Sequence, residues 1–235
     1  MNWWEKLEQD PCILENKCGR VGQEKCNRKC YVYYFSRLLY SNSNLPKLAL
    51  KEYKLVPEKS DVESFNICKE YEENILEHVK KGHGIYLYSS NKGNGKTSWT
   101  FKFALEYIKQ VSVKGELEGR SVYYVNISNL FEYIRINMND KEKLQELERR
   151  IMGSHLVIFD DLGVEAPTEW VLGKLYNYIN ERYINGKAMI FTSNLSYAEL
   201  SKRLDVRIMD RISEVCRPIE FKGVSRRRTK SWWNT

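Results

Sequence analysis

The feature that most constrains the fold is an alternation of short apolar runs with longer segments of helical periodicity, which begins near residue 61. The runs cover residues 85–88, 122–127, 156–159, 188–192 and 219–221. Runs of this length bounded by polar turns are typical of buried strands. Buried strands that alternate with helices form a mostly parallel sheet with helices on both faces. The sequence therefore predicts an α/β fold built on a parallel five-stranded sheet.

Helical periodicity fills the segments between these runs. Residues 61–81 alternate apolar and charged positions and end at Gly82, which favours a helix stop. Further helices are expected at 97–111, 129–138, 141–152, 168–185 and 196–204. Residues 41–60 contain Pro46 and Pro57 and are interpreted as a linker. We therefore divide the chain into a cysteine-rich module (1–40), a linker (41–60) and a main domain (61–235).

A glycine-rich turn joins the first predicted strand to the next helix, with the sequence Ser90-Asn91-Lys92-Gly93-Asn94-Gly95-Lys96-Thr97. It matches the phosphate-loop pattern G-x-x-x-x-G-K-[ST] except at Ser90. In such loops the backbone N–H groups surround phosphates, the lysine neutralises them and the hydroxyl ligates Mg²⁺. The alternative is an ordinary glycine-rich turn. The motif predicts ATP and Mg²⁺ binding by Asn91, Lys92, Gly93, Asn94, Gly95, Lys96, Thr97 and Ser98.

Two carboxylates, Asp160 and Asp161, follow the apolar run 156–159. We expect Asp160 to hold Mg²⁺ together with Thr97, and Asp161 to act as the general base that polarises the attacking water. A strand that ends in a helix N-cap is the alternative interpretation. A third strand tip carries Asn194, which could contact the γ-phosphate or the water, or could simply form a turn.

With these three motifs in this order, the sequence resembles the AAA+ ATPases of the DnaC/DnaI helicase-loader family, particularly the versions found in phages of Gram-positive bacteria. The resemblance covers residues 61–230. Its most specific stretches are 156–170 (LVIFDDLGVEAPTEW), 189–196 (MIFTSNLS) and 207–211 (RIMDR). It implies an AAA+ P-loop fold, ATP hydrolysis and a sensor 1 role for Asn194. Asp161 stands where many AAA+ proteins have Glu, which implies slow hydrolysis.

The resemblance also implies roles for two arginines. Arg211 corresponds to the finger that reaches the ATP of a neighbouring subunit, and Arg227 to sensor 2, although the run 226–228 leaves that register open. Arg207 and Arg211 are four residues apart, so they share a helix face. A solvated basic helix face is the alternative.

Four cysteines, Cys12, Cys18, Cys26 and Cys30, fall within 19 residues. Four thiolates could hold one tetrahedral Zn²⁺, which would stabilise a segment too short to have its own core. Firmicute loaders resemble this chain in having such a module, but their C-x-x-C knuckle is absent here. Unliganded thiols are the alternative. Cys68 and Cys216 are interpreted as core residues.

The net charge of +7 is concentrated at the ends of the chain. Residues 1–60 carry 11 basic and 7 acidic side chains, and residues 201–235 carry 10 and 4. Basic ends indicate phosphate-bearing partners, or solubility alone. No long apolar run and no secretory signal are evident, so we expect a cytoplasmic protein with no membrane partner.

Three functions remain open. The first is a helicase loader that binds a replicative hexameric helicase and single-stranded DNA and self-associates through its ATP interfaces. Initiator-type AAA+ proteins carry an extra helix in the region of the helices expected here at 129–138 and 141–152, and that helix faces single-stranded DNA. The second is a transposition helper ATPase of the IstB type. The third is a nucleotide-binding adaptor with little hydrolysis.

Overall fold

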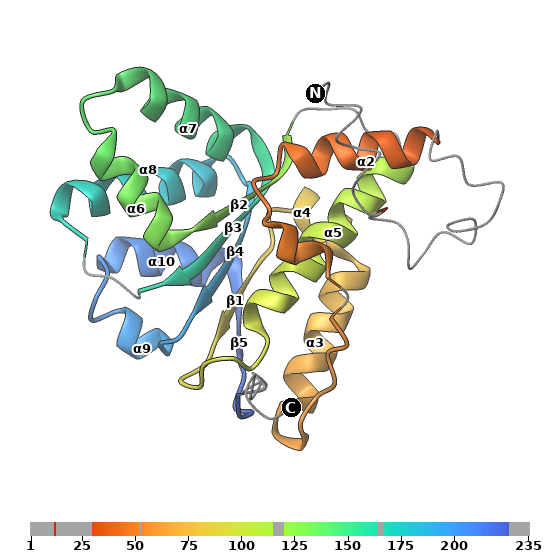
Figure 1. Cartoon of the computed structure of the whole chain (residues 1–235). Coiled ribbons are helices and arrows are strands. Elements are labelled where there is room, and N and C mark those ends of the chain that lie inside the picture. Colours follow the sequence, from red (N-terminus) through yellow and green to blue (C-terminus); the bar gives the residue numbers. More distant parts are fainter. Residues whose placement is uncertain (1–11, 13–29, 52, 115–119, 164–166, 226–235) are drawn as a thin grey trace, which may run out of the picture.

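A five-stranded sheet forms the centre of the molecule. The computed structural model describes residues 12, 30–51, 53–114, 120–163 and 167–225 (Figure 1). The strands are β1 (Gly84–Tyr88), β2 (Arg120–Asn126), β3 (Ser154–Leu162), β4 (Ala188–Ser193) and β5 (Cys216–Glu220). Their order is β2-β3-β4-β1-β5, and every neighbouring pair is parallel. The predicted parallel five-stranded sheet is therefore confirmed.

Helices cover both faces of this sheet (Figure 1). One face carries α2 (Tyr31–Ser41), α3 (Val62–Glu73), α4 (Ile75–Lys80) and α5 (Lys96–Lys114). The other carries α6 (Ile127–Ile136), α7 (Lys141–Gly153), α8 (Glu169–Ile184) and α10 (Val206–Val215). The short helix α9 (Tyr197–Leu200) follows β4, and the 3-10 helices η1 (Lys47–Leu50) and η2 (Lys59–Asp61) precede α3.

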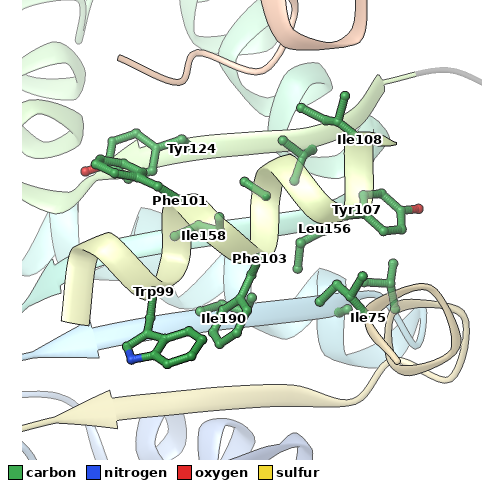
Figure 2. Close-up of a cluster of buried hydrophobic side chains, with 14 of the residues drawn as sticks. Ile75, Trp99, Phe101, Phe103, Tyr107, Ile108, Tyr124, Leu156, Ile158 and Ile190 are labelled. Atoms are coloured by element: carbon green, nitrogen blue, oxygen red, sulfur yellow. The ribbon is translucent and has the colours of Figure 1, made fainter. Parts of the chain in front are cut away.

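Successive apolar residues of β1, β2, β3 and β4 alternate between two hydrophobic cores. In β3, Leu156 and Ile158 pack beneath α5, whereas Val157 and Phe159 belong to the core on the opposite face. Figure 2 shows the first of these cores, where the aromatic side chains of α5 lie over the strands. Because both faces of β1, β3 and β4 are buried, these strands are mostly apolar, which is why they are visible in the sequence.

Residues 30–51 contain more secondary structure than their sequence predicts. Helix α2 packs against α5, and the side chains of Phe35, Leu39, Leu45 and Ala49 are buried in the α5 core. The proposed division into module, linker and domain stays a prediction. The packing adds that residues 31–50 complete the core of the main domain.

The expected helix over 61–81 is wrong in one respect, because the structure has two helices there. The break lies at Asn74, whose backbone N–H and side-chain amide both donate to the carbonyl of Glu70. An asparagine that bonds to the backbone competes with helix continuation. The predicted stop at Gly82 is confirmed, with a φ of 73°.

Two further findings concern the length of α9 and the apolar character of the helices. Ser196 and Glu199 form a capping box at the start of α9, but α9 ends at Leu200 and a turn replaces the rest of the helix expected at 196–204. None of the described helices combines the length and the apolar character that crossing a bilayer requires.

Candidate nucleotide-binding site

The loop between β1 and α5 has the backbone shape that phosphate binding requires. Gly93 and Gly95 adopt φ values of 78° and 103°, a region that glycine enters without steric cost. The loop runs directly into the first turn of α5, the positive end of the helix dipole. Free backbone N–H groups at a helix N-terminus form an anion site. The residues present therefore fit a bound phosphate.

Lys96 is held inside this loop rather than extended into solvent. Its side chain is buried, and the ammonium donates to the Asn91 carbonyl at 3.3 Å and to Asn94 Oδ1 at 3.1 Å. Both acceptors are uncharged, whereas phosphate oxygens are anionic and form stronger hydrogen bonds with an ammonium. Lys96 is thus placed where it can exchange neutral partners for phosphate.

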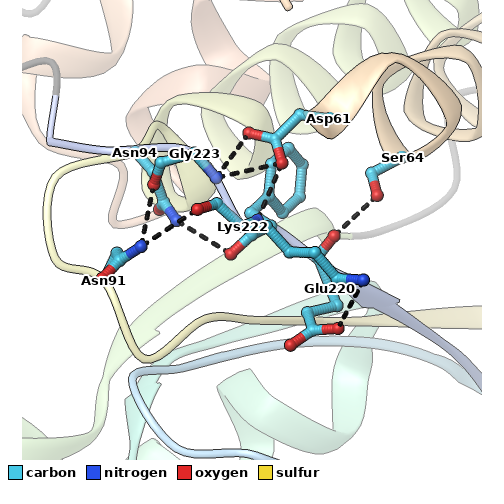
Figure 3. Close-up of polar contacts among 8 residues, drawn as sticks. Asp61, Ser64, Asn91, Asn94, Glu220, Lys222 and Gly223 are labelled. Carbon is cyan, nitrogen blue, oxygen red and sulfur yellow. Dashed lines mark hydrogen bonds and ion pairs between the residues drawn. The ribbon is translucent and has the colours of Figure 1, made fainter. Parts of the chain in front are cut away.

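Two asparagines tie the loop to the segment that follows β5 (Figure 3). Asn94 Nδ2 donates to Ser89 Oγ at 2.6 Å and to the Phe221 carbonyl at 3.4 Å. Asn91 Nδ2 donates to the carbonyls of Lys222 and Gly223 at 3.0 and 3.3 Å. The chain that leads toward residues 226–228 therefore starts beside the phosphate loop. Arg227 itself lies outside the described residues.

The buried carboxylate of Asp61 fixes the same segment from the other side. Its Oδ1 accepts the backbone N–H groups of Lys222 at 2.7 Å and Gly223 at 3.1 Å. A Cβ atom on Gly223 would lie only 2.4 Å from Asp61 Oδ2, so glycine allows this close approach. Sequence analysis did not single out Asp61, because its partners are backbone groups more than 150 residues away.

Asp160 lies at the centre of a cluster of hydroxyl groups. It is 2% exposed and accepts from Tyr124 Oη at 2.6 Å, Thr192 Oγ1 at 2.7 Å and Thr97 Oγ1 at 3.1 Å. The two residues predicted to hold Mg²⁺, Thr97 and Asp160, are thus in contact. Hydroxyl and carboxylate oxygens are suitable ligands for this hard cation. We call Asp160, Thr97, Tyr124 and Thr192 the metal side of the site.

Tyr124 and Thr192 were not predicted as site residues. Thr192 stands in the polar tip that precedes Asn194, so a signal for it existed. Tyr124 stands inside an apolar strand and carries no sequence signal. Burial and the neighbouring Asp160 carboxylate raise the pKa of the Tyr124 phenol, so it is a neutral donor over the working pH range.

Asp161, the next residue, has a different environment. Its φ is 62°, a value that is rare for residues other than glycine. The pairing of β3 with β4 shifts register between Phe159 and Leu162. Its backbone N–H donates to Thr192 Oγ1 at 2.9 Å, and Asn194 Nδ2 lies 3.5 Å from its Oδ1. A bulge of this kind re-aims a side chain. We call Asp161 and Asn194 the water side.

The helix N-cap alternative for the two aspartates is wrong, since α8 is capped by Thr168 and β3 continues to Leu162. Positive φ outside glycine costs about 1–3 kcal/mol and is concentrated at functional sites. The backbone of Asp161 therefore supports a functional interpretation of this residue over a merely structural one.

Arg211 lies on α10 and points to α8. Its guanidinium is 4.5 Å from the ring centre of Tyr183, and its Nε donates to Asn180 Oδ1 at 3.3 Å. Arg207 stacks similarly on Tyr176, also at 4.5 Å. The predicted shared helix face is confirmed. Within the described part of the chain, these contacts of Arg211 are on α8 and α10 and not on its own phosphate loop.

The family model described as IstB-like ATP binding protein matches residues 72–232, which include every motif of the site. The chain belongs to the IstB-like ATP-binding family. The replicative helicase loader DnaI of Bacillus subtilis (strain 168) is 26% identical over 160 residues, 63% of this chain and 48% of that protein. The chain spans about half the length of the curated relatives it matches.

Solved structures with the same fold include two helicase-loader proteins. A crystal structure of DnaI has a TM-score of 0.61 at 23% identity and covers 79% of this chain and 95% of its own. The DnaC helicase loader has a TM-score of 0.59 at 23% identity, with 71% and 92% covered. These likenesses show that this IstB-like chain shares the fold of both proteins. The predicted resemblance to the helicase-loader family is confirmed by the family model and by the sequence match to DnaI.

The cysteines of this IstB-like protein are only partly described. Cys18 and Cys26 lie outside the described residues. Cys12 is buried, whereas Cys30 is exposed and its Sγ caps α2 by accepting the Tyr33 N–H at 3.3 Å. Among the residues that the structure describes, no group of three or more His, Cys, Asp or Glu side chains could hold a metal ion. The zinc site stays a prediction.

Cys68 and Cys216 are buried, which confirms their interpretation as core residues. Burial raises the pKa of both thiols well above the usual range, so both stay protonated and unreactive.

Proposed function

We propose that this IstB-like protein is an ATP-hydrolysing helicase loader of DNA replication. The proposal rests on the observation that Lys96, Thr97 and Asp160 lie together with the Asp161–Asn194 pair at the carboxyl end of the sheet. The carboxyl ends of β1, β3 and β4 meet there, and open α/β sheets bind ligands at the carboxyl ends of their strands. The similarity to DnaI and DnaC gives the class of function.

Each part of the site has a separate task in the proposed reaction. The loop N–H groups and Lys96 bind the phosphates of ATP. Thr97 and Asp160 would hold Mg²⁺, which neutralises charge on the transferred phosphoryl group. Asp161 and Asn194 orient the attacking water, and Asp161 takes its proton. An aspartate is shorter than the glutamate of many AAA+ proteins, so slow turnover is expected.

Assembly would complete the site. Arg211 contacts Tyr183 and Asn180 of α8 in its own chain, and we propose that in the assembly it acts as a finger on the nucleotide of a neighbouring subunit. Sensor 2, proposed at Arg227, would follow from the segment that Asp61 and Asn91 hold beside the loop.

Single-stranded DNA is the proposed ligand of the groove between α6, α7 and β2, which has a volume of about 670 Å³. Its lining includes Tyr123, Tyr133, Asn129 and Arg150. Aromatic rings interleaved with a cation and amides are suited to bases and phosphates.

Partner capture tests this proposal. The immobilised full-length chain, with ATP, is offered a replicative hexameric helicase of a Gram-positive bacterium and, separately, an IS21-type transposase. Retention of the helicase but not of the transposase supports the loader. Retention of the transposase alone would favour the transposition helper, and ATP binding without phosphate release, with or without single-stranded DNA, would favour the adaptor.

Zinc belongs to the same proposal, as a metal centre of the helicase-binding segment. Freshly isolated, reduced protein should contain about one Zn²⁺ per chain, held by Cys12, Cys18, Cys26 and Cys30. Elemental analysis that finds no zinc would remove this part of the proposal and leave the ATPase part intact.

A further inference from the structure

One residue of the metal side, Tyr124, also contacts the N-terminal part of the chain. Its hydroxyl donates to Asp160 Oδ2 at 2.6 Å. Its backbone N–H donates to the Ser43 carbonyl at 2.7 Å, and its carbonyl accepts from Asn44 Nδ2 at 2.9 Å. Residues 43 and 44 directly follow α2. Tyr124 therefore joins the end of α2 to the carboxylate that is proposed to hold Mg²⁺.

The position of Tyr124 in the sheet explains why these contacts exist. Strand β2 is an edge strand, paired only with β3 on its other side. An edge leaves backbone groups unpaired unless another segment covers them. At Tyr124 the turn after α2 pairs with this edge in place of another strand. It does so through the Ser43 carbonyl and the Asn44 side-chain amide.

The turn itself is built firmly. Ser43 is fully buried, and its hydroxyl donates to the Tyr40 carbonyl at 2.6 Å and accepts the Leu45 N–H at 3.2 Å. Asn44 adopts a φ of 57°, which asparagine tolerates better than most residues. The Tyr40 hydroxyl donates to the Pro46 carbonyl at 2.9 Å. The turn is thus anchored to α2 and moves with it.

The ring of Tyr124 is equally confined. It is buried against Phe101 of α5, as Figure 2 shows. The two ring centres are 5.5 Å apart. A fixed backbone and a packed ring leave the hydroxyl little freedom to move independently. A displacement of residues 43–44 is therefore transmitted to the hydrogen bond on Asp160.

We propose that Tyr124 is a positioning residue that couples helix α2, and the N-terminal segment before it, to the metal-ligating carboxylate Asp160. The inference rests on the proposed function, because it requires Mg²⁺-dependent nucleotide binding at Asp160. In this account a partner that shifts α2 changes the orientation of Asp160 and with it the affinity for Mg²⁺ and ATP. Groups that orient a metal ligand typically change metal affinity about 10–100-fold when they are removed.

Binding of a fluorescent ATP analogue to the full-length chain, measured over a series of Mg²⁺ concentrations, tests the coupling. Tyr124→Phe should raise the Mg²⁺ concentration at half-saturation about tenfold. It should leave binding in the presence of EDTA unchanged. Tyr107→Phe is the matched control, since Tyr107 is a buried tyrosine of the same core and its hydroxyl contacts His155 instead of Asp160. It should leave the Mg²⁺ dependence at the parent value.

A second variant tests the path through α2. Asn44→Ala should raise the Mg²⁺ half-saturation in the same direction, by about threefold, since only one of the two contacts to Tyr124 is lost. Adding Asn44→Ala to Tyr124→Phe should change nothing further, because the same path is already broken. Thermal unfolding of each variant, followed without nucleotide, separates this result from a general loss of stability.

Three outcomes would overturn the inference. The first is a Tyr124→Phe variant with the Mg²⁺ dependence of the parent. The second is an Asn44→Ala variant that lowers the unfolding temperature but not the apparent Mg²⁺ affinity, and the third is a double variant whose two effects add in full. A different result, a parent chain that binds no ATP at any Mg²⁺ concentration, would contradict the proposed function. The inference about Tyr124 would then lose its basis as well.

Discussion

The two neighbouring aspartates of β3 differ in almost every respect. On the metal side, Asp160 is buried, pairs with Asn126 of β2 and accepts three hydroxyl hydrogen bonds. On the water side, Asp161 is half-buried and has a positive φ, and Asn194 reaches it only at 3.5 Å. A carboxylate that is held by several donors is suited to a fixed ligand. A carboxylate whose hydrogen-bond partner lies at a longer distance is suited to a general base, which must contact a water molecule that arrives and leaves.

Thr192 connects the two sides. Its hydroxyl donates to Asp160 and accepts the backbone N–H of Asp161. One side chain of β4 thereby sets the geometry of both aspartates. The comparison predicts that variants of the metal side lose affinity, that variants of the water side lose turnover, and that Thr192 affects both.

The largest effect should come from a residue that completes the water side from another subunit. Arg211→Ala should keep the ATP affinity of the parent but lose assembly-dependent hydrolysis by about 10³-fold or more. Lys96→Ala is inactive for a different reason and retains its own arginine. Mixing the two variants should recover part of the activity in composite sites, as phosphate release would show. Mixtures that assemble but stay inactive would contradict a finger that acts in trans.

Removing the phosphate contact itself should affect binding next most strongly. Lys96→Ala deletes the buried ammonium that now bonds to Asn91 and Asn94. Because charge-assisted hydrogen bonds contribute about 1.5–3 kcal/mol each, ATP affinity should fall by about 100-fold or more. Lys109→Ala is the control, since it removes a lysine of α5 that lies outside the phosphate loop and pairs with Glu106. Equilibrium dialysis that gives equal ATP affinity for the parent and Lys96→Ala would show that phosphates bind elsewhere.

On the water side, Asn194→Ala should have a moderate and selective effect. Its contact with Asp161 is long, so we expect a loss of about tenfold in turnover, which corresponds to about 1.4 kcal/mol. The affinity for ATP should stay within about twofold, because Asn194 is not one of the groups that bind the phosphates or Mg²⁺. Steady-state kinetics that show a raised KM with normal kcat would place Asn194 on the metal side instead.

The smallest change should affect both sides at once. Thr192→Val keeps the shape of the side chain but leaves the Asp161 N–H without its acceptor, which costs about 1–3 kcal/mol of unfolding free energy. Affinity and turnover should both fall by a few-fold. Thr192→Ser, which keeps the hydroxyl, should restore both. A serine variant as impaired as the valine variant would indicate that the methyl group matters and the hydroxyl does not.

The sequence predicted the parts of this site that depend on local geometry. Glycines at positions 93 and 95, a following lysine and threonine, and carboxylates after an apolar strand each have a meaning within a few residues. Tyr124 and Thr192 act through the register of three adjacent strands, which the sequence does not specify. A tyrosine in an apolar run is interpreted as core, and only the structure shows its hydroxyl on Asp160.

The same distinction explains two of the three differences between the expected and the observed helices. Helix α2 has apolar side chains on most of its surface, so its period was hidden, and its burial depends on contact with the distant helix α5. The break at Asn74 depends on one side chain bonding to the preceding turn instead of to solvent. In both cases a side chain has more than one possible packing or hydrogen-bond partner. The composition of the segment does not show which partner is preferred.

The most direct test of the account compares Asp160→Asn and Asp161→Asn in one experiment that measures both ATP affinity and phosphate release. Asp161→Asn should bind ATP with Mg²⁺ as the parent does and release phosphate about 10²–10⁴-fold more slowly, as expected for the loss of a general base. Asp160→Asn should lose Mg²⁺-dependent affinity. If Asp161→Asn hydrolyses ATP at the parent rate, or if both variants lose affinity equally, the division of the site into a metal side and a water side is wrong.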